Sequence, residues 1–260
     1  MRARHLVMAA AAVVTVAASL SAQRFRQRDA TEILDTIPYD GRFTFARVKF
    51  DVGDGGGGGG RGFFGGRGDL KWNHDYPRAE RNFTRILQEI SIMDVHLQGS
   101  NVLTLTDPEI FRHPVLYLCE PGFWWPNDEE VAALREYVYK GGFIIFDDFI
   151  GGRHWMNFEE QVRRVFPDQR LVQLDASHPV FDSFFRIESL DFRDPNRGTP
   201  SEFWGMFENN DPAGRLLFIA NYNNDIGDYW EWSDQGFLPI ELSNEAYKLG
   251  VNYVIYALTH

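Results

Sequence analysis

The sequence predicts an α/β protein, a three-layer flavodoxin-like sandwich around a mostly parallel central sheet. Short apolar runs of β-forming residues alternate along the chain with stretches of helical periodicity, a pattern typical of parallel sheets with helices on both faces. Residues 143–146 are apolar at every position, which favours a central strand covered on both sides. Gly141 and Gly142 directly precede this run and end the helix expected before it.

The other elements are expected on either side of this central strand. Runs of aromatic, β-branched and other apolar residues predict further strands at residues 43–50, 101–105, 114–119, 169–174 and 215–222. Helical periodicity predicts helices at residues 78–91, 155–166 and 244–258, with a helical turn at 107–111. The helix at 78–91 is expected to bury Phe83, Ile86, Leu87 and Ile90.

Two helices carry cap signals. Asn127 can cap the helix that ends at Gly141, and Glu130 at the third helical position completes a variant of the capping box. Ser243 is the expected cap of the last helix, whose apolar stripe packs on the sheet.

The first 22 residues have the layout of a secretory signal peptide. Arg2, Arg4 and His5 precede an apolar run at residues 6–20, and small residues follow, so cleavage is expected near Ala22. The apolar run is shorter than the ~20 residues that a membrane-spanning helix needs. We therefore expect a periplasmic or secreted protein with no membrane span after signal removal. An uncleaved membrane anchor is the alternative.

Beyond the signal, we expect an N-terminal arm at residues 23–42 and one α/β domain at residues 43–260. A Gly-rich insertion at residues 53–68 interrupts this domain, since eleven of its 16 positions are Gly. Backbone amides of Gly-rich loops can bind phosphate, but neither a Gly-Lys-Ser/Thr sequence nor a helix follows here. The segment is therefore interpreted as a flexible surface loop.

Charge and cysteine content limit the function. The formal net charge is −11 and becomes −13 when the signal with its two arginines is removed. Such a surface repels nucleic acid and anionic lipid, so neither is an expected partner. Cys119 is the only cysteine, which excludes an internal disulfide. Its neighbour Glu120 disfavours a thiolate, and Cys119 is interpreted as a buried structural residue.

The clearest candidates for chemistry follow the strand at residues 143–146. Ligands of α/β proteins bind at the carboxyl ends of parallel strands, where Asp147 and Asp148 are expected. Adjacent strand residues point to opposite faces, so one of the two should enter the crevice. Glu120, at the end of the neighbouring strand, and His154 complete the candidate catalytic set. The alternative is that the two aspartates cap and terminate their loop.

Candidate ligand-binding residues are expected at the same edge. Gly122 belongs to a turn after the strand at 114–119, and Trp124 and Trp125 offer ring faces beside the acids, suited to stacking on a sugar. Alternatively, these rings fix the entry to the next helix. His178 is a further candidate because it follows the strand at 169–174, and a local hydrogen bond in the Pro turn is its alternative role.

Residues 221–231 place oxygen donors at alternating positions, as a Ca²⁺ loop does. Asn223, Asp225 and Asp228 are the candidate metal ligands. Ile226 and Trp232 break the EF-hand pattern at its sixth and twelfth positions, so no cofactor is expected, and calcium is the one ion that the pattern suggests. A turn fixed by Asn and Asp side chains is the alternative.

Four segments are distinctive in combination: PVLYLCEPGFWWPNDEEVAALREYVYKGGFIIFDDF, SHPVFDSFF, NYNNDIGDYWEW and AYKLGVNYVIYAL. Together they resemble the DUF4159 family, from about residue 43 to the C-terminus. The resemblance implies a fold similar to class I glutamine amidotransferases, but no assigned activity. Amidotransferases of that fold place a nucleophilic Cys after the central strand, where this chain has Asp147 and Asp148. The resemblance thus implies the architecture without the thiol.

We therefore expect an exported, non-catalytic or degenerate amidotransferase-like domain that binds a small ligand or a protein partner in the cell envelope. Cysteine-dependent glutamine hydrolysis is not expected. The alternative is a hydrolase of sugars or cell-wall fragments that uses the strand-end carboxylates. A third interpretation is a structural role, in which the Gly-rich loop with Phe63 and Phe64 docks onto a membrane complex.

Overall fold

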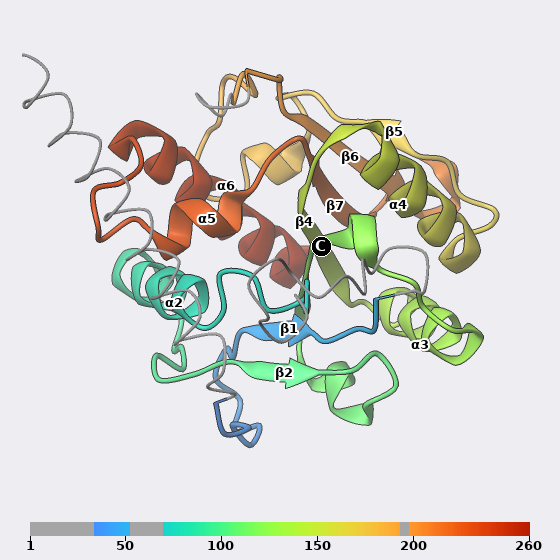
Figure 1. Cartoon of the computed structure of the whole chain (residues 1–260), viewed down its shortest axis with the longest axis horizontal. Helices are drawn as coiled ribbons and strands as arrows, with labels where there is room; N and C mark the ends of the chain where they lie inside the picture. The colour runs from blue at the N-terminus through green and yellow to red at the C-terminus, as the bar shows by residue number, and fades with distance from the viewer. Residues whose placement is uncertain (1–33, 53–69, 193–197) are drawn as a thin grey trace, which may run out of the picture.

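The computed structural model describes residues 34–52, 70–192 and 198–260 (Figure 1). Its strands are β1 (Ala46–Val48), β2 (Asn101–Leu103), β3 (Val115–Cys119), β4 (Phe143–Phe149), β5 (Val172–Gln173), β6 (Glu202–Phe207) and β7 (Leu216–Tyr222). Its α-helices are α2 (Arg78–Ile90), α3 (Asp128–Tyr139), α4 (Gly151–Val165), α5 (Ile226–Glu231) and α6 (Ile240–Thr259). Short 3₁₀ helices are η1 (Pro108–Arg112), η2 (Pro121–Phe123), η3 (Pro179–Phe181) and η4 (Glu208–Asn210).

The strands form one seven-stranded sheet in the order β2-β1-β3-β4-β7-β6-β5. The first five strands in this order are parallel, and β6 runs antiparallel to both of its neighbours. Numbered along the chain, the five parallel strands follow the flavodoxin-like order 2-1-3-4-5. The strand order reverses between β1 and β3, which is where ligands bind in folds of this kind.

Helices cover both faces of the sheet, with α2, α5 and α6 on one face and α3 and α4 on the other (Figure 1). Alternate residues of the central strands face different layers: Tyr117 packs in the first layer, whereas Leu116 and Leu118 pack in the second. All five residues of β3 are buried. The predicted three-layer α/β sandwich with a mostly parallel sheet is confirmed.

Local signals predicted the start of α3 correctly. Asn127 Oδ1 accepts a hydrogen bond from Glu130 N at 3.0 Å, and Glu130 Oε2 accepts one from Asn127 N at 2.9 Å. These reciprocal bonds form the expected capping box.

The predicted buried face of α2 was correct at two of its four residues. Phe83 and Leu87 are buried, but Ile86 is half-buried and Ile90 is exposed. The helix instead buries a stripe that includes Glu80, because this carboxylate forms an ion pair with the fully buried Arg47 of β1. A charged pair inside the protein thus overrides the hydrophobic pattern.

Other boundaries differ from the sequence predictions. β4 extends three residues past Phe146, and α4 begins at Gly151, four residues earlier than expected. α6 begins at Ile240, so Ser243 is buried inside the helix and does not cap it. Neither β6 nor α5 was predicted from the sequence.

The expected signal peptide and the Gly-rich insertion at residues 53–68 lie outside the described residues, as do residues 23–33 of the expected arm. Within residues 34–52, 70–192 and 198–260, none of the helices has the length and apolar character needed to cross a bilayer.

Phe146 in the middle of β4 tests the packing of the sheet against α4. Its ring is fully buried against Trp124, Phe158 and Phe218. Phe146→Ala is expected to lower the free energy of unfolding by about 3–5 kcal/mol, since it leaves a cavity in a well-packed core. Urea denaturation measures the change.

Met156 provides the control for this substitution, because it lies on α4 and is 71% exposed. Met156→Ala is expected to change stability by no more than about 0.5 kcal/mol. Equal denaturation midpoints for the two variants would contradict the described core.

Candidate functional site

The carboxyl ends of β1, β3, β4 and β7 meet at one edge of the sheet, because these strands are parallel. Acidic residues follow three of them: Glu120 after β3, Asp147 and Asp148 at the end of β4, and Asp225 after β7. The segment at residues 70–77, between β1 and α2, adds His74 and Asp75 to the same edge. These residues form the candidate site.

Asp147 is fully buried and joins several elements of the fold. Its Oδ2 accepts hydrogen bonds from Tyr117 Oη at 2.7 Å and from Gly227 N at 3.0 Å, and its Oδ1 accepts one from Asn221 Nδ2 at 2.9 Å. Asn221 in turn accepts a hydrogen bond from Tyr253 Oη at 2.9 Å. Burial raises the pKa of Asp147 to about 6, against the opposing effect of the hydrogen bonds from Asn221 and Tyr117. Both oxygens of the Asp147 carboxyl group are therefore hydrogen-bonded inside the protein.

Asp148 points to a different environment from Asp147. The pairing of β4 with β7 shifts register between Phe146 and Phe149, and Asp148 has a φ of 58°. Such bulges change the direction in which a side chain points. Asp148 Oδ2 lies 3.7 Å from Cys119 Sγ and 3.6 Å from His74 Nδ1, and its side chain is 12% exposed.

Glu120 also has a left-handed backbone, with a φ of 52°, directly after β3. Its Oε1 lies 2.9 Å from His74 Nδ1 and 3.3 Å from Lys71 Nζ. His74 therefore lies beside two carboxyl groups that come from neighbouring strands.

The backbone of the His74 segment is held by Arg47. The buried guanidinium donates hydrogen bonds to the carbonyl oxygens of Trp72 at 2.9 Å and of His74 at 2.8 Å. The same guanidinium pairs with Glu80 of α2 and lies over the ring of Tyr117, 4.8 Å from its centroid. Arg47 thus connects β1, β3 and α2 to the turn that carries His74.

Three overlapping groups of side chains at this edge have metal-ligand atoms within 4.8 Å of one another. The groups are His74, Glu120 and Asp148; Asp75, Cys119 and Asp148; and Asp75, Asp228 and Glu231. Asp148 and Asp75 each belong to two groups. The first group offers an imidazole together with two carboxylates.

The deeper acids of the site favour their protonated forms. Burial raises the pKa of Asp75 and of Asp225 well above the ordinary value of 3.8, and the charges of nearby carboxylates such as Asp148 and Asp228 add to this effect. Burial likewise raises the pKa of the Cys119 thiol, and the charges of Asp148 and Asp75 raise it further. A neutral, buried thiol is a poor nucleophile.

His154 and Gly122 lie in contact beside the acids. A Cβ atom at Gly122 would come within 2.5 Å of the His154 side chain, so only glycine permits this approach. The His154 ring packs on Phe123, and its Nδ1 accepts a hydrogen bond from Ile150 N at 3.4 Å. Burial lowers the pKa of His154, while the charges of Glu120 and Asp148 oppose that shift.

The two neighbouring tryptophans have different environments. Trp124 is fully buried against Phe146, and its carbonyl oxygen accepts a hydrogen bond from Asn157 Nδ2 at 3.0 Å. Its ring belongs to the core, in line with the alternative that it fixes the entry to α3. Trp125 is 41% exposed and is the one of the pair with a ring face accessible to a ligand.

His178 lies away from this edge, contrary to the prediction. Its ring packs against Phe207 and Tyr256, and Tyr256 Oη accepts a hydrogen bond from Leu216 N at the start of β7. The start of a parallel strand is the opposite edge of the sheet from Asp148. His178 Nδ1 accepts a hydrogen bond from Val180 N at 3.1 Å, the local role weighed as its alternative.

The Asn- and Asp-rich segment after β7 uses its side chains to bind backbone amides. Asn223 Oδ1 accepts a hydrogen bond from Gly151 N at 3.1 Å, and Asp225 Oδ1 accepts one from Asp228 N at 2.9 Å. Asp225 thereby caps α5. These contacts are those of a fixed turn. Of the three predicted metal ligands, Asp228 belongs to a group with metal-ligand geometry, together with Asp75 and Glu231.

Sequence reasoning missed Lys71, His74 and Asp75, which lie between the Gly-rich insertion and α2. The nearest signal is the sequence Trp-Asn-His-Asp-Tyr-Pro, rich in polar and turn-forming residues. Lys71 and Asp75 have positive φ values of 59° and 65°, which no periodicity reveals.

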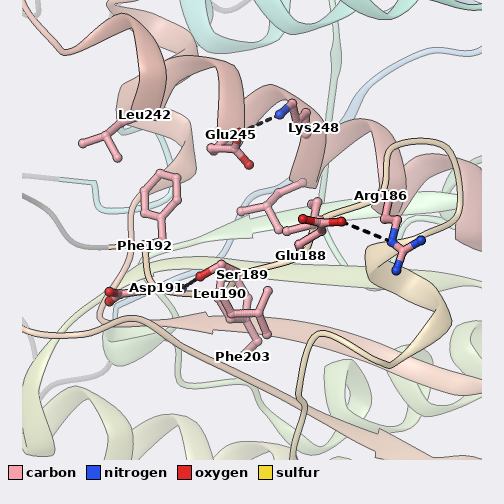
Figure 2. A pocket seen from close by; sticks show the side chains of 12 residues that line it. Arg186, Glu188, Ser189, Leu190, Asp191, Phe192, Phe203, Leu242, Glu245 and Lys248 are labelled. Carbon is pink, nitrogen blue, oxygen red and sulfur yellow. Dashed lines mark hydrogen bonds and ion pairs between the residues drawn. The ribbon is translucent and has the colours of Figure 1, made fainter.

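A separate cavity of about 380 Å³ lies between residues 186–192 and α6 (Figure 2). Two ion pairs line it, Lys248 with Glu245 at 2.6 Å and Arg186 with Glu188 at 3.7 Å. Because both of these cations are already paired with acids, the cavity offers less distinctive chemistry than the carboxyl edge of the sheet.

Asp225→Asn tests the protonation of the buried acids. Burial in the native state raises the pKa of Asp225. Between the unfolded pKa of about 4 and this higher folded pKa, the native state binds a proton that the unfolded chain does not. The free energy of unfolding therefore falls as the pH rises through this range. Asn caps a helix as well as Asp does. Asp225→Asn should raise the denaturation midpoint at about pH 7 and leave it unchanged near pH 4.

Urea unfolding in EDTA at the two pH values measures this effect. Asp107→Asn, at the cap of η1, controls for the exchange of Asp by Asn outside the acidic cluster. A lower midpoint of Asp225→Asn at neutral pH would contradict a protonated Asp225.

Comparison with known proteins supports one assignment. Residues 44–258 match the model of DUF4159, described as a domain of unknown function. No curated protein matches the chain. Since the match covers well over half of the sequence, the chain belongs to the DUF4159 family.

Proposed function

We propose that this domain binds a small ligand at the carboxyl edge of its sheet, and that it does so in the cell envelope. One observation carries the proposal: His74, Glu120 and Asp148 come from three separate segments and converge within 4.8 Å of one another. They do so where the strand order reverses, beside β1 and β3, which is the usual ligand position in doubly wound sheets.

Backbone conformation supports a binding role for Glu120 and Asp148. Both are non-glycine residues at positive φ, 52° and 58°. Such conformations cost about 1–3 kcal/mol each and persist where surrounding structure enforces them, often at ligand sites. In this domain they direct two carboxyl groups toward His74.

The position of Asp148 favours binding over thiol catalysis. β4 passes through this positive-φ residue into α4, and enzymes with a nucleophile elbow carry Ser or Cys at such a turn. Cys119 is buried, and its raised pKa keeps it protonated. Both features argue against cysteine-dependent glutamine hydrolysis.

The surroundings favour a hydroxyl-rich ligand with an apolar face, such as a sugar or a soluble cell-wall fragment. Carboxylates accept hydrogen bonds from hydroxyl groups. Trp125 is partly exposed, and Phe123 is half-buried, with Lys71 Nζ 4.2 Å from its ring centroid. Because Lys71 Nζ also lies 3.3 Å from Glu120 Oε1, the ring of Phe123 lies close to the acids.

Asp148→Asn tests the proposed binding. Soluble peptidoglycan fragments and disaccharides are expected to raise the melting temperature of the wild-type protein, and Asp148→Asn is expected to reduce the affinity by about tenfold, as for the loss of one charged hydrogen bond. Isothermal titration calorimetry measures the affinity. Glu202→Gln, on β6, is the matched control and should bind as the wild type does.

Equal binding by the wild-type protein and Asp148→Asn would contradict the proposed location. An absence of binding by every probe would contradict the proposed ligand class.

A hydrolase is the second candidate function, favoured by the neighbourhood of Asp75 and Asp148. These two residues offer oxygen atoms within 4.8 Å of each other, and the raised pKa of Asp75 keeps it protonated. A protonated acid beside a second carboxyl group is the arrangement of general acid and base in glycoside hydrolysis. Turnover of the same probes by the wild-type protein, abolished in Asp148→Asn and Asp75→Asn, would favour this candidate over simple binding.

The envelope location has its own test. The layout of residues 1–22 predicts that the exported protein begins at Gln23. Intact-mass measurement on protein from the periplasm or medium of an expressing bacterium should give the mass of residues 23–260, and Ala22→Arg should block the cleavage. Full-length protein retained in the cytoplasm would contradict export.

A further inference from the structure

We propose that His74, Glu120 and Asp148 bind a divalent transition-metal ion of the zinc or manganese type. This inference rests on the proposed function for the position of the site, and it adds the chemical class of what is bound there. His74 lies between β1 and α2, Glu120 follows β3 and Asp148 lies near the end of β4, so the fold itself brings the donors together.

The distances suit a shared ion. His74 Nδ1 lies 2.9 Å from Glu120 Oε1 and 3.6 Å from Asp148 Oδ2. Nitrogen and oxygen ligands lie about 2.0–2.2 Å from zinc, so neighbouring ligands of one ion are roughly 3–3.5 Å apart. The two distances from His74 Nδ1 are close to this spacing, and all three donor atoms lie within 4.8 Å of one another.

The donor set selects the class of metal. Imidazole nitrogen favours zinc and other transition metals, while carboxylates also bind manganese. Calcium takes 6–8 oxygen ligands, and this group offers two carboxyl groups and a nitrogen. The site therefore differs from the calcium loop that the sequence after β7 suggests.

The turn that carries His74 is fixed by hydrogen bonds to its backbone. Arg47 donates a hydrogen bond to the His74 carbonyl oxygen at 2.8 Å and to that of Trp72 at 2.9 Å, and Arg47 is itself fixed by Glu80. These contacts fix the backbone of the turn from which the His74 side chain projects. Glu120 is likewise fixed, since its backbone N–H donates to the Asp147 carbonyl oxygen at 2.9 Å.

The local charge balance also favours a cation. Glu120 and Asp148 belong to the proposed group, and Lys71 and His74 are the basic side chains within 3.3 Å of Glu120 Oε1. A divalent ion lowers the repulsion between these two carboxylates more than one protonated imidazole does.

The test uses the full-length protein after EDTA treatment and removal of the chelator. Calorimetric titration with Zn²⁺ and Mn²⁺ should show one ion per chain, with weaker binding of Ca²⁺. His74→Ala and Asp148→Asn should each lower the Zn²⁺ affinity at least tenfold. His260→Ala, at the exposed C-terminal residue, controls for adventitious histidine binding and should leave the affinity unchanged.

Cobalt provides a readout that does not depend on the variants folding. Co²⁺ bound to the wild-type protein by one nitrogen and two carboxylates should give visible d–d absorption, and added Zn²⁺ should abolish it. Melting curves establish that each variant is folded before its affinity is compared.

Absence of binding would overturn the inference, as would equal Zn²⁺ affinity in His74→Ala and the wild-type protein, or stoichiometric Ca²⁺ binding in preference to Zn²⁺. The proposed function fails separately. If peptidoglycan fragments bind in EDTA with unchanged affinity and Zn²⁺ does not bind, the metal is refuted and the ligand site stands.

Discussion

The buried carboxyl group of Asp147 is the interaction on which the carboxyl edge of the sheet depends. It accepts hydrogen bonds from β3, β7 and the start of α5 through Tyr117, Asn221 and Gly227. An ionised carboxylate buried without such partners would cost several kcal/mol. Asp147 is hydrogen-bonded inside the protein, whereas the bulge in β4 directs the next residue, Asp148, toward His74 and Cys119. One residue anchors the edge and the next belongs to the candidate site.

A second buried polar contact positions His74 in the candidate site. Arg47 has no exposed surface, yet it reaches the turn that carries His74, pairs with Glu80 and packs on Tyr117. Removing one partner of a buried pair leaves an uncompensated charge, so β1, α2 and this turn are expected to hold their relative positions together. His74 is therefore placed by the core, even though its own side chain is partly exposed.

Local patterns predicted what depends on neighbouring residues, namely the central strand, the capping box at Asn127 and the position of acids at the end of β4. The proximity of Glu120 to Asp148 was also predictable, since adjacent parallel strands end at the same edge of the sheet. The place of His74 could not be predicted, because it depends on Arg47 and on positive φ values in its turn. His178 was misplaced because the chain after β5 crosses the sheet toward Phe207 and does not stay at the strand end.

The proposed ligand site of this domain lies among His74, Glu120 and Asp148. Anomalous diffraction at the zinc edge, from crystals soaked in Zn²⁺, shows whether an ion binds there. The predicted result is one strong anomalous peak within coordination distance of His74 Nδ1 and of both carboxylates. A peak at the Asp225 turn alone, or none at the carboxyl edge of the sheet, would contradict it.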